Sequence, residues 1–197
     1  MDEYEVFKQH ILKRVALTPE EMTELLAGFK PKKVKKRQFI IQPDFRAMHR
    51  NYVVQGAFRS YVIGQDGTDH TIQFALEDWW ISDYNSYTYQ RPATMFVVAL
   101  EDSTILQIDY ETEQSLKAKH HKIETFFRIG AERTAAYHQR RIISSLTQTA
   151  EERYDAFLAT YPSAAQRLPQ YAVASYLGMT TQFLSQIRKK QLGKKLK

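Results

Sequence analysis

The stretch ASYLGMTTQFLSQIRKK, residues 174–190, has the pattern of two short helices joined by a tight turn. Gly178 permits the backbone conformation that such a turn requires, and Thr180 can cap the helix that follows. We expect the first helix to pack through Tyr171, Val173, Ala174 and Leu177. We expect the second to pack through Phe183, Leu184 and Ile187. The pattern predicts a helix-turn-helix that starts at Pro169.

The opposite face of the second helix is polar and cationic. Its residues are Thr181, Gln182, Ser185, Gln186, Arg188 and Lys189. Glutamine can read adenine through two hydrogen bonds, threonine can contact a thymine methyl, and arginine or lysine can hold guanine or phosphate. This division of faces is the one that a DNA-recognition helix requires. The alternative is a helical hairpin that docks on its own domain, and a face without acidic residues argues against it.

Positive charge is concentrated in the same part of the chain. The 197 residues carry a formal net charge of +6, and Asp155 is the last acidic residue. Residues 1–155 hold 21 basic and 22 acidic side chains, so the excess lies wholly in residues 156–197. Such a segment suggests a polyanionic partner, because neutralising phosphates releases condensed counterions. A solvated lysine-rich tail that aids solubility is the other interpretation.

Residues 34–108 have the pattern of short strands and turns. The β-rich runs are residues 39–41, 52–54, 58–63, 71–74, 95–100 and 104–108. Gln65-Asp66-Gly67 is a tight-turn signal that joins two of them into a hairpin. Their close spacing predicts a small antiparallel β-barrel or jelly roll. The preceding run KPKKVKKR, residues 30–37, reads better as the exposed entry to the first strand than as a nuclear-import signal, and it could also contact nucleic acid or RNA polymerase.

Helices are predicted on both sides of this β region. Residues 1–30 show helical spacing, and Thr18 with Glu21 forms a capping box. Thr149 with Glu152 forms a second box, which opens a helix that stops at Tyr161-Pro162. Residues 163–168 are expected to be a polar link.

A long helix is predicted from His120 to Leu146. Its apolar stripe consists of Ile123, Phe127, Ala131, Ala135, Ile142 and Leu146. We interpret this stripe as a dimer seam, which Tyr137, His138 and Arg141 interrupt. The alternative is a helix that belongs to the core of its own chain.

Residues 174–180 and the motif FLSQIR, residues 183–188, resemble the helix-turn-helix of the Crp/Fnr family of bacterial transcription regulators. The resemblance is greatest to a short branch ending roughly in LG-x-T-x-x-x-LS-x-IR-KK, and the order of elements upstream agrees with it. The fold class it implies is α+β: N-terminal helices, an antiparallel β-roll or jelly-roll sensor domain, a long dimerisation helix and a C-terminal helix-turn-helix. The domains would be residues 1–118, a cyclic-nucleotide-binding-like sensor; 119–147, the linking and dimerising helix; and 148–197, the DNA-binding unit.

The family's function implies double-stranded DNA as partner and a homodimer, and RNA polymerase is a further candidate partner. The base-reading positions fall on Thr181, Gln182 and Gln186. The positions that contact phosphate or support the helix are Thr180, Ser185, Arg188 and Lys189. Members of the family usually continue into a β-hairpin wing, but here only residues 191–197 remain. We expect the wing to be missing or reduced, with its backbone contacts transferred to Lys194, Lys195 and Lys197.

The sensor departs from the family at its effector site. Members that bind cyclic nucleotides use a Gly-Glu segment and an Arg-Ser/Thr pair, because a buried phosphate needs a cation and the ribose hydroxyl needs a carboxylate. Here Trp79 or Trp80 stands near the glycine position, and Ser82 or Asp83 stands near the glutamate position. Ala93 stands where the arginine belongs, Thr94 follows, and Arg91 comes two residues early. We therefore predict that the roll binds no cyclic nucleotide in the usual way.

A different small-molecule effector could bind in this region of the roll. The candidate pocket residues are Trp79, Trp80, Ser82, Asp83, Arg91 and Thr94, which would suit a more apolar or aromatic ligand. The competing interpretation is that the aromatic residues are simply core and rim of the barrel. No other cofactor is expected.

Several classes of protein are disfavoured by composition and motif. The absence of cysteine excludes disulfides, iron–sulfur clusters and thiolate zinc sites. We expect a cytoplasmic protein, since no apolar run approaches the roughly 18 residues that span a membrane and the N-terminus does not read as a signal peptide. The six histidines form no metal-binding pattern, and no catalytic motif is present. We predict no catalytic or metal site and no enzyme, with a barrel-type enzyme as the weakest alternative. The main rival is a β-barrel ligand-sensing or protein-interaction module that does not bind DNA.

Overall fold

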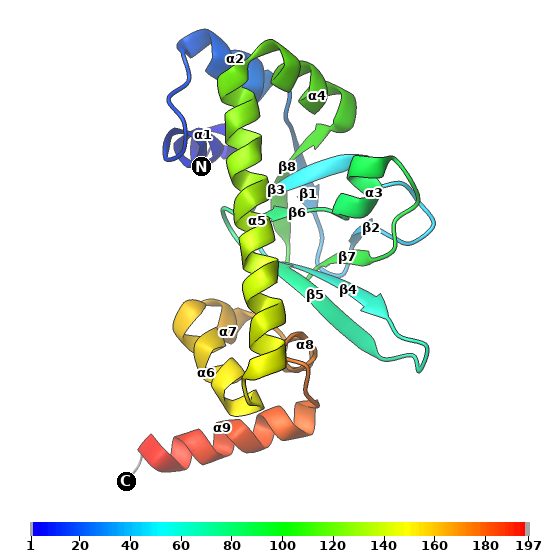
Figure 1. The fold of residues 1–197 in the computed structure, drawn as a ribbon, viewed down its shortest axis with the longest axis vertical. Helices are drawn as coiled ribbons and strands as arrows, with labels where there is room; N and C mark the ends of the chain where they lie inside the picture. The colour runs from blue at the N-terminus through cyan, green and yellow to red at the C-terminus, as the bar shows by residue number, and fades with distance from the viewer. Residues whose placement is uncertain (1, 196–197) are drawn as a thin grey trace.

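The computed structural model describes residues 2–195. A single long helix, α5 (His121–Thr147), runs along the longest axis of the molecule (Figure 1). The N-terminal helices and the β-strands lie along its first part, and the C-terminal helices gather around its other end. The last helix, α9 (Thr181–Lys195), lies across that end.

The first two helices begin where the sequence predicts. They are α1 (Glu3–Leu12) and α2 (Pro19–Ala27). The Thr18 side chain accepts a hydrogen bond from the Glu21 amide, and the Glu21 carboxylate accepts one from the Thr18 amide, so the predicted capping box is present. Phe7 and Ile11 of α1 are fully buried against Leu25, Tyr52 and Phe126.

The β-region is a roll of two four-stranded sheets. One sheet has the order β1 (Lys30–Val34), β8 (Ser103–Asp109), β3 (His49–Gln55) and β6 (Trp80–Ile81). The other has the order β2 (Phe39–Ile41), β7 (Phe96–Ala99), β4 (Phe58–Ile63) and β5 (Asp69–Ala75). All pairings are antiparallel. A core formed by Val53, Phe58, Ile81, Val97 and Ile105, among others, fills the roll, and the predicted α+β fold class is confirmed.

Two segments of the roll differ from the sequence-based prediction. The basic run at residues 30–34 is itself strand β1, paired with β8 at the edge of its sheet, and all of it but Val34 is exposed. Lysines on an edge strand discourage pairing with a further strand. The loop after β6 contains a short helix, α3 (Tyr84–Tyr89), capped by Asp83.

The remaining helices follow β8. They are α4 (Tyr110–Lys119), α5, α6 (Ala150–Thr160), α7 (Ala164–Arg167), α8 (Gln170–Tyr176) and α9. The prediction of an irregular polar link at residues 163–168 is therefore wrong for residues 164–167. Residues 164–167 form a helical turn because Ala164 and Leu168 are buried against the other C-terminal helices.

The apolar stripe predicted for α5 is buried in its first part and exposed in its second part. Ile123 and Phe127 are buried in the core that α1, α2 and the roll share. Ala131, Ala135, Ile142 and Leu146 are exposed. Tyr137 and Arg141, which interrupt the stripe in the sequence, face the same chain: the Tyr137 hydroxyl lies 2.5 Å from that of Tyr176.

The C-terminal helices pack directly on strand β5. Phe74 and Leu76 share a hydrophobic core with Leu168, Val173 and Leu177. The Ser175 hydroxyl accepts a hydrogen bond from the Thr71 amide (2.9 Å) and donates one to the Asp69 carbonyl (2.6 Å). The roll and the helix-turn-helix are thus joined by packed side chains as well as by α5.

Candidate nucleic-acid interface and effector site

The turn between α8 and α9 is built by Gly178. Its φ of 67° lies in the left-handed region, which glycine adopts without steric cost. The Met179 amide donates to the Ala174 carbonyl (3.0 Å), which closes the end of α8. The Thr180 hydroxyl accepts a hydrogen bond from the Phe183 amide (3.2 Å) and so caps α9. The local sequence thereby sets the angle at which α9 leaves the turn.

The predicted reading face of α9 is accessible. Gln182, Gln186, Arg188 and Lys189 are exposed, whereas Thr181 and Ser185 are half-buried. Ser185 has a structural partner, because its hydroxyl accepts a hydrogen bond from Gln170 Nε2 of α8 (2.7 Å). On the inner face, Leu184 and Ile187 are buried as predicted.

Two aromatic residues that were predicted to be buried are exposed. Phe183 is 43% exposed and Tyr171 is 52% exposed, although both were expected to be buried. The Tyr171 ring lies over the Arg59 guanidinium of β4, 5.3 Å from it, and Ala172 is buried instead. Phe183 precedes Gln186 by three residues on the helix, so it adds an apolar group to the exposed reading face.

The basic side chains after Lys189 are only partly described. Lys190 Nζ lies 2.7 Å from Glu151 Oε1 of α6. Gln191 donates to Asp155 of the same helix (2.5 Å). Lys194 and Lys195 fall within α9, and Lys197 lies outside the described residues. Residues 191–195, which follow the predicted recognition helix, continue α9 as a helix and form no strand.

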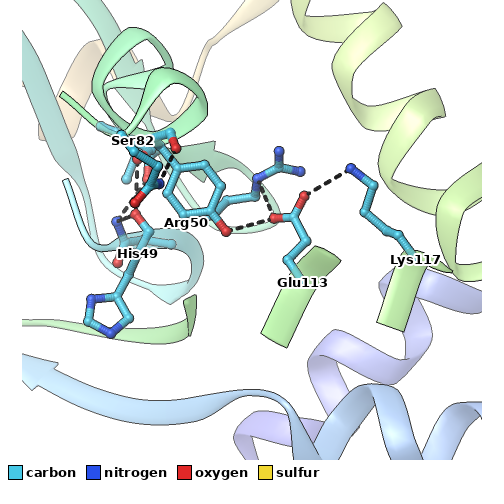
Figure 2. A network of polar contacts seen from close by, with 9 residues as sticks. His49, Arg50, Ser82, Glu113 and Lys117 are labelled. Atoms are coloured by element: carbon cyan, nitrogen blue, oxygen red, sulfur yellow. Dashed lines mark hydrogen bonds and ion pairs between the residues drawn. The ribbon is translucent and has the colours of Figure 1, made fainter. Parts of the chain in front are cut away.

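The carboxylate of Asp83, one of the predicted effector residues, already accepts hydrogen bonds from its own chain. It is fully buried; its Oδ1 accepts a hydrogen bond from the Ser86 amide (3.1 Å), and its Oδ2 accepts from the Thr94 amide (2.8 Å) and hydroxyl (3.3 Å). The neighbouring Ser82 hydroxyl donates to the His49 carbonyl (2.9 Å), as Figure 2 shows. Both side chains hold the loop around α3 in place.

The other predicted effector residues lie apart from this pair. The Trp79 ring packs against Tyr137 and Tyr161, at centroid distances of 6.0 and 5.3 Å. The Trp80 ring packs on the other side, against Tyr52 (5.4 Å). Arg91 is exposed, with its guanidinium over Tyr89 and hydrogen-bonded to Asn85. Of the six residues, only Asp83 and Thr94 are brought into direct contact, and the two tryptophans line separate cavities.

A buried ionic cluster that the sequence did not reveal lies beside Trp80. Arg50 of β3 is 8% exposed, and its Nε lies 3.1 Å from Oε2 of the fully buried Glu113 of α4. The same oxygen accepts a hydrogen bond from the Tyr87 hydroxyl (2.9 Å), and Lys117 Nζ lies 3.5 Å from the other oxygen, Oε1 (Figure 2). Burial first, and then the Glu113 charge, raise the pKa of the Tyr87 hydroxyl. No short motif marks this cluster, because its members come from β3, α3 and α4.

No metal centre is formed by the described residues. Across residues 2–195, the histidine and acidic side chains make no group of three or more that could hold an ion. Over the same residues, no helix combines the length and apolar character needed to cross a bilayer.

Comparisons with known proteins identify the fold through structure and not through sequence. No protein-family model matches this sequence, and no curated protein matches it. Among solved structures, FixK2 from Bradyrhizobium japonicum is similar with a TM-score of 0.72 and 16% identity, over 84% of this chain and 85% of that one. CLP, the c-di-GMP-responsive global regulator of Xanthomonas campestris, is similar with a TM-score of 0.73 and 13% identity, over 91% and 94% of the two chains.

A third similar structure carries the family name. It is a regulator from Eubacterium rectale assigned to the Crp/Fnr family, with a TM-score of 0.69 and 14% identity, over 90% of this chain and 85% of that one. In each case the match covers more than four fifths of both chains, so it extends well beyond the roll. The chain therefore has the fold of the Crp/Fnr family of transcription regulators.

Proposed function

We propose that this chain is a sequence-specific DNA-binding transcription regulator of the Crp/Fnr type. The observation that carries the proposal is the exposed face of α9, on which Gln182, Gln186, Arg188 and Lys189 project from a helix that leaves a tight turn. No acidic residue follows Asp155, so nothing on that helix repels a phosphate backbone. In this proposal residues 148–197 form the DNA-binding unit, residues 1–118 the sensor and residues 119–147 the dimerising link.

Base reading is assigned to the middle of the exposed face. With α9 in the major groove, Thr181, Gln182 and Gln186 face the base edges, and each glutamine can pair with an adenine. Phe183, exposed beside them, supplies an apolar surface for a thymine methyl. Arg188 and Lys189 contact phosphates, while Thr180 and Ser185 mainly support the helix through the hydrogen bonds that they make within the protein.

The regulator is proposed to act as a homodimer. The exposed part of the α5 stripe, Ala131, Ala135, Ile142 and Leu146, supplies an apolar seam for a second copy of the chain. Two-fold symmetry then requires a palindromic operator with half-sites about one helical turn apart. The basic edge strand β1, far along the chain from α9, is a candidate contact for RNA polymerase.

The roll is proposed not to bind cyclic nucleotides in the usual way. Both oxygens of Asp83 are engaged by backbone and side-chain donors of the same loop, so ribose would have to displace Thr94 or Ser86. The buried Ala93 supplies no cation for a phosphate. Calorimetric titration with cyclic AMP and cyclic GMP is expected to give no heat of binding, and micromolar binding of either would contradict this part of the proposal.

The DNA-binding proposal is tested by selection and by substitution. Selection of binding sites from random duplexes with the purified chain is expected to enrich one palindromic motif. Gln182→Ala and Gln186→Ala should each cost about 1–3 kcal/mol and relax the preference at one position of each half-site. Arg188→Ala should weaken binding to all sequences about equally and reduce the slope of log K against log salt by about 1.

Gln191→Ala is the matched control for the glutamine variants. It changes the same residue type on the same helix, but its amide is bonded to Asp155 of α6. Its binding preference should equal that of the unaltered chain. A selection without an enriched motif would favour the alternative, a ligand-sensing or protein-interaction module that does not bind DNA.

A further inference from the structure

A cavity lies between α1, the roll and α5, beside the buried guanidinium of Arg50. We call it the Arg50 cavity. Its lining residues are His10, Arg14, Arg50, Trp80, Tyr84, Phe126, Phe127 and Gly130. Its empty volume is about 260 Å³ when the part open to solvent is included, and its enclosed part has room for about one water molecule. The space is narrow, so only a small ligand would fit.

The Arg50 guanidinium is held in place by aromatic rings. Its central carbon lies 5.1 Å from the ring centroids of both Tyr84 and Phe127, 5.6 Å from that of Tyr87 and 5.9 Å from that of Trp80. Such contacts stabilise a cation and fix its orientation, but aromatic faces accept no strong hydrogen bonds. The rings therefore orient the head group without satisfying its N–H donors.

Most of the hydrogen-bonding capacity of Arg50 is unused. Guanidinium carries five N–H donors. Nε approaches Glu113 at 3.1 Å but makes no hydrogen bond there, and within the part of the chain that the structure describes no acceptor engages Nη1 or Nη2. The Glu113 oxygens face Tyr87 and Lys117 and accept no hydrogen bond from Arg50 (Figure 2). Nε is the donor shown to be buried without an acceptor, and a guanidinium that is largely buried with unpaired donors points to a bound water or anion.

The surroundings of the cavity favour an anion. Arg14 lines it, and burial first, and then the nearby positive charge of Arg133, lower the pKa of the Arg14 guanidinium. His10 is neutral near pH 7, since burial lowers its pKa to about 4. Arg14, Arg50, Arg133 and Lys117 thus face two carboxylates, Glu113 and Asp78. The Tyr84 hydroxyl, which makes no hydrogen bond with another described residue, offers a further donor.

We propose that the Arg50 cavity binds a small carboxylate. Its two oxygens would accept hydrogen bonds from Nη1 and Nη2 of Arg50 in the paired geometry that guanidinium and carboxylate share. Its apolar body would lie against Trp80, Tyr84 and Phe126. A carboxylate suits the site better than phosphate, because phosphate carries more charge and more oxygens than these donors and rings can accommodate. The site differs from the region of Asp83 and Thr94, since none of its donors comes from that loop.

The test is a titration of the full chain without DNA, so its result does not depend on the DNA-binding proposal. Trp80 lines the cavity, and tryptophan fluorescence therefore reports on occupancy. We expect saturable responses to benzoate and to acetate at pH 7.5. Benzamide, which has the shape of benzoate without its charge, should give none, and inorganic phosphate should bind more weakly than benzoate.

Substitutions connect the response to the cavity. Arg50→Gln should weaken benzoate binding roughly tenfold or more, as expected for the loss of a charged hydrogen-bonding pair. Arg14→Gln, at the cavity but not in the ionic cluster, should weaken it less. Arg140→Gln is the control, because that arginine of α5 is exposed and does not line the cavity. If Arg50→Gln fails to fold, Arg50→Lys, which keeps the charge and loses the paired geometry, should show the same weakening.

The following outcomes would overturn the proposal. They are the absence of saturation with both carboxylates, equal binding of benzamide and benzoate, tighter binding of phosphate than of benzoate, and unchanged benzoate affinity in the Arg50 and Arg14 variants.

Discussion

Gly178 and Gly130 place the same residue type in opposite conformations. Gly178 has a φ of 67° in the turn before α9, and a Cβ added there would meet no atom within 4 Å. Gly130 lies inside α5, where a Cβ also finds open space. We expect Gly178→Ala to destabilise the fold by about 1 kcal/mol through the left-handed backbone alone. Gly130→Ala should stabilise it by about 1 kcal/mol, because alanine is the better helix former.

Urea unfolding of the two glycine variants, followed by circular dichroism, checks this pair. Gly178→Asn should recover part of the loss, since asparagine tolerates left-handed backbone better than alanine does. A destabilising Gly130→Ala would show that this position on α5 is more crowded than the added methyl group can accept.

His10 makes stability depend on pH. Burial, with the Arg14 charge second, lowers its pKa from 6.5 to about 4. The unfolded chain therefore binds a proton at a higher pH than the folded chain does. The stability that the folded chain gains from a neutral His10 is therefore complete above pH 6.5 and is lost as the pH falls toward 4. When the pH is lowered from 7.5 to 5.5, we expect the free energy of unfolding to fall by about 1 kcal/mol.

The comparison is between the unaltered chain and His10→Phe, which keeps a ring among Phe7, Tyr52 and Phe126. Its free energy of unfolding should fall less over the same pH range. His121→Gln, which removes an exposed histidine of α5, is the control. An equal pH dependence in His10→Phe and the unaltered chain would rule out this role for His10.

At the scale of single elements, one face of α5 packs on its own chain and another face is exposed. Tyr137 and Arg141 hold it to its own chain, whereas Ile142 and Leu146 are 60% and 79% exposed. Because Leu146 contacts little in the single chain, Leu146→Glu should leave the fold stable and separate a dimer into monomers. Light scattering measures the mass in solution. Thr147→Glu adds the same charge to the neighbouring face and should remain dimeric, and a monomeric unaltered chain would contradict the seam.

At the scale of the whole molecule, Arg141 links α5, the roll and the helix-turn-helix. Its guanidinium donates to the carbonyls of Ile72 and Thr71 on β5 and of Tyr176 on α8, and its charge lies 4.2 Å from the Tyr176 ring. Arg141→Met leaves these carbonyls without their donor. We expect the free energy of unfolding to fall by about 2–4 kcal/mol, because at least one hydrogen bond from a charged donor is lost.

The shared core has a second consequence for unfolding. Since Phe74 of β5 packs with Val173 and Leu177 of the helix-turn-helix, the unaltered chain should unfold in one calorimetric transition. Arg141→Met should lower its midpoint or split it in two. Arg140→Met, at the exposed neighbouring position, should leave the transition unchanged. Two well-separated transitions in the unaltered chain would show that the roll and the C-terminal helices are thermodynamically independent.

The order of elements and the face division of α9 could be predicted from the sequence because both depend on residues close together in the chain. Capping at Thr18 and Thr149, the turn at Gly178, and the burial of Leu184 and Ile187 all follow from spacings of one to four residues. The same local reasoning misplaced Phe183 and Tyr171, since an aromatic residue at the edge of an apolar stripe packs inward only where a neighbour covers it. It also passed over α3 and α7, which are too short to show a period.

Only the tertiary structure decided which polar groups meet. Asp83 and Thr94 lie 11 residues apart, and the buried Asp83 carboxylate accepts hydrogen bonds from the Thr94 amide and hydroxyl. Arg50 and Glu113 come from β3 and α4, and no pattern along the chain pairs a strand arginine with a helix glutamate 63 residues later. Adjacent Trp79 and Trp80 line different cavities because neighbouring residues point in different directions. Periodicity determined the helices and strands of this protein, whereas the meeting of distant elements determined its buried charges and cavities.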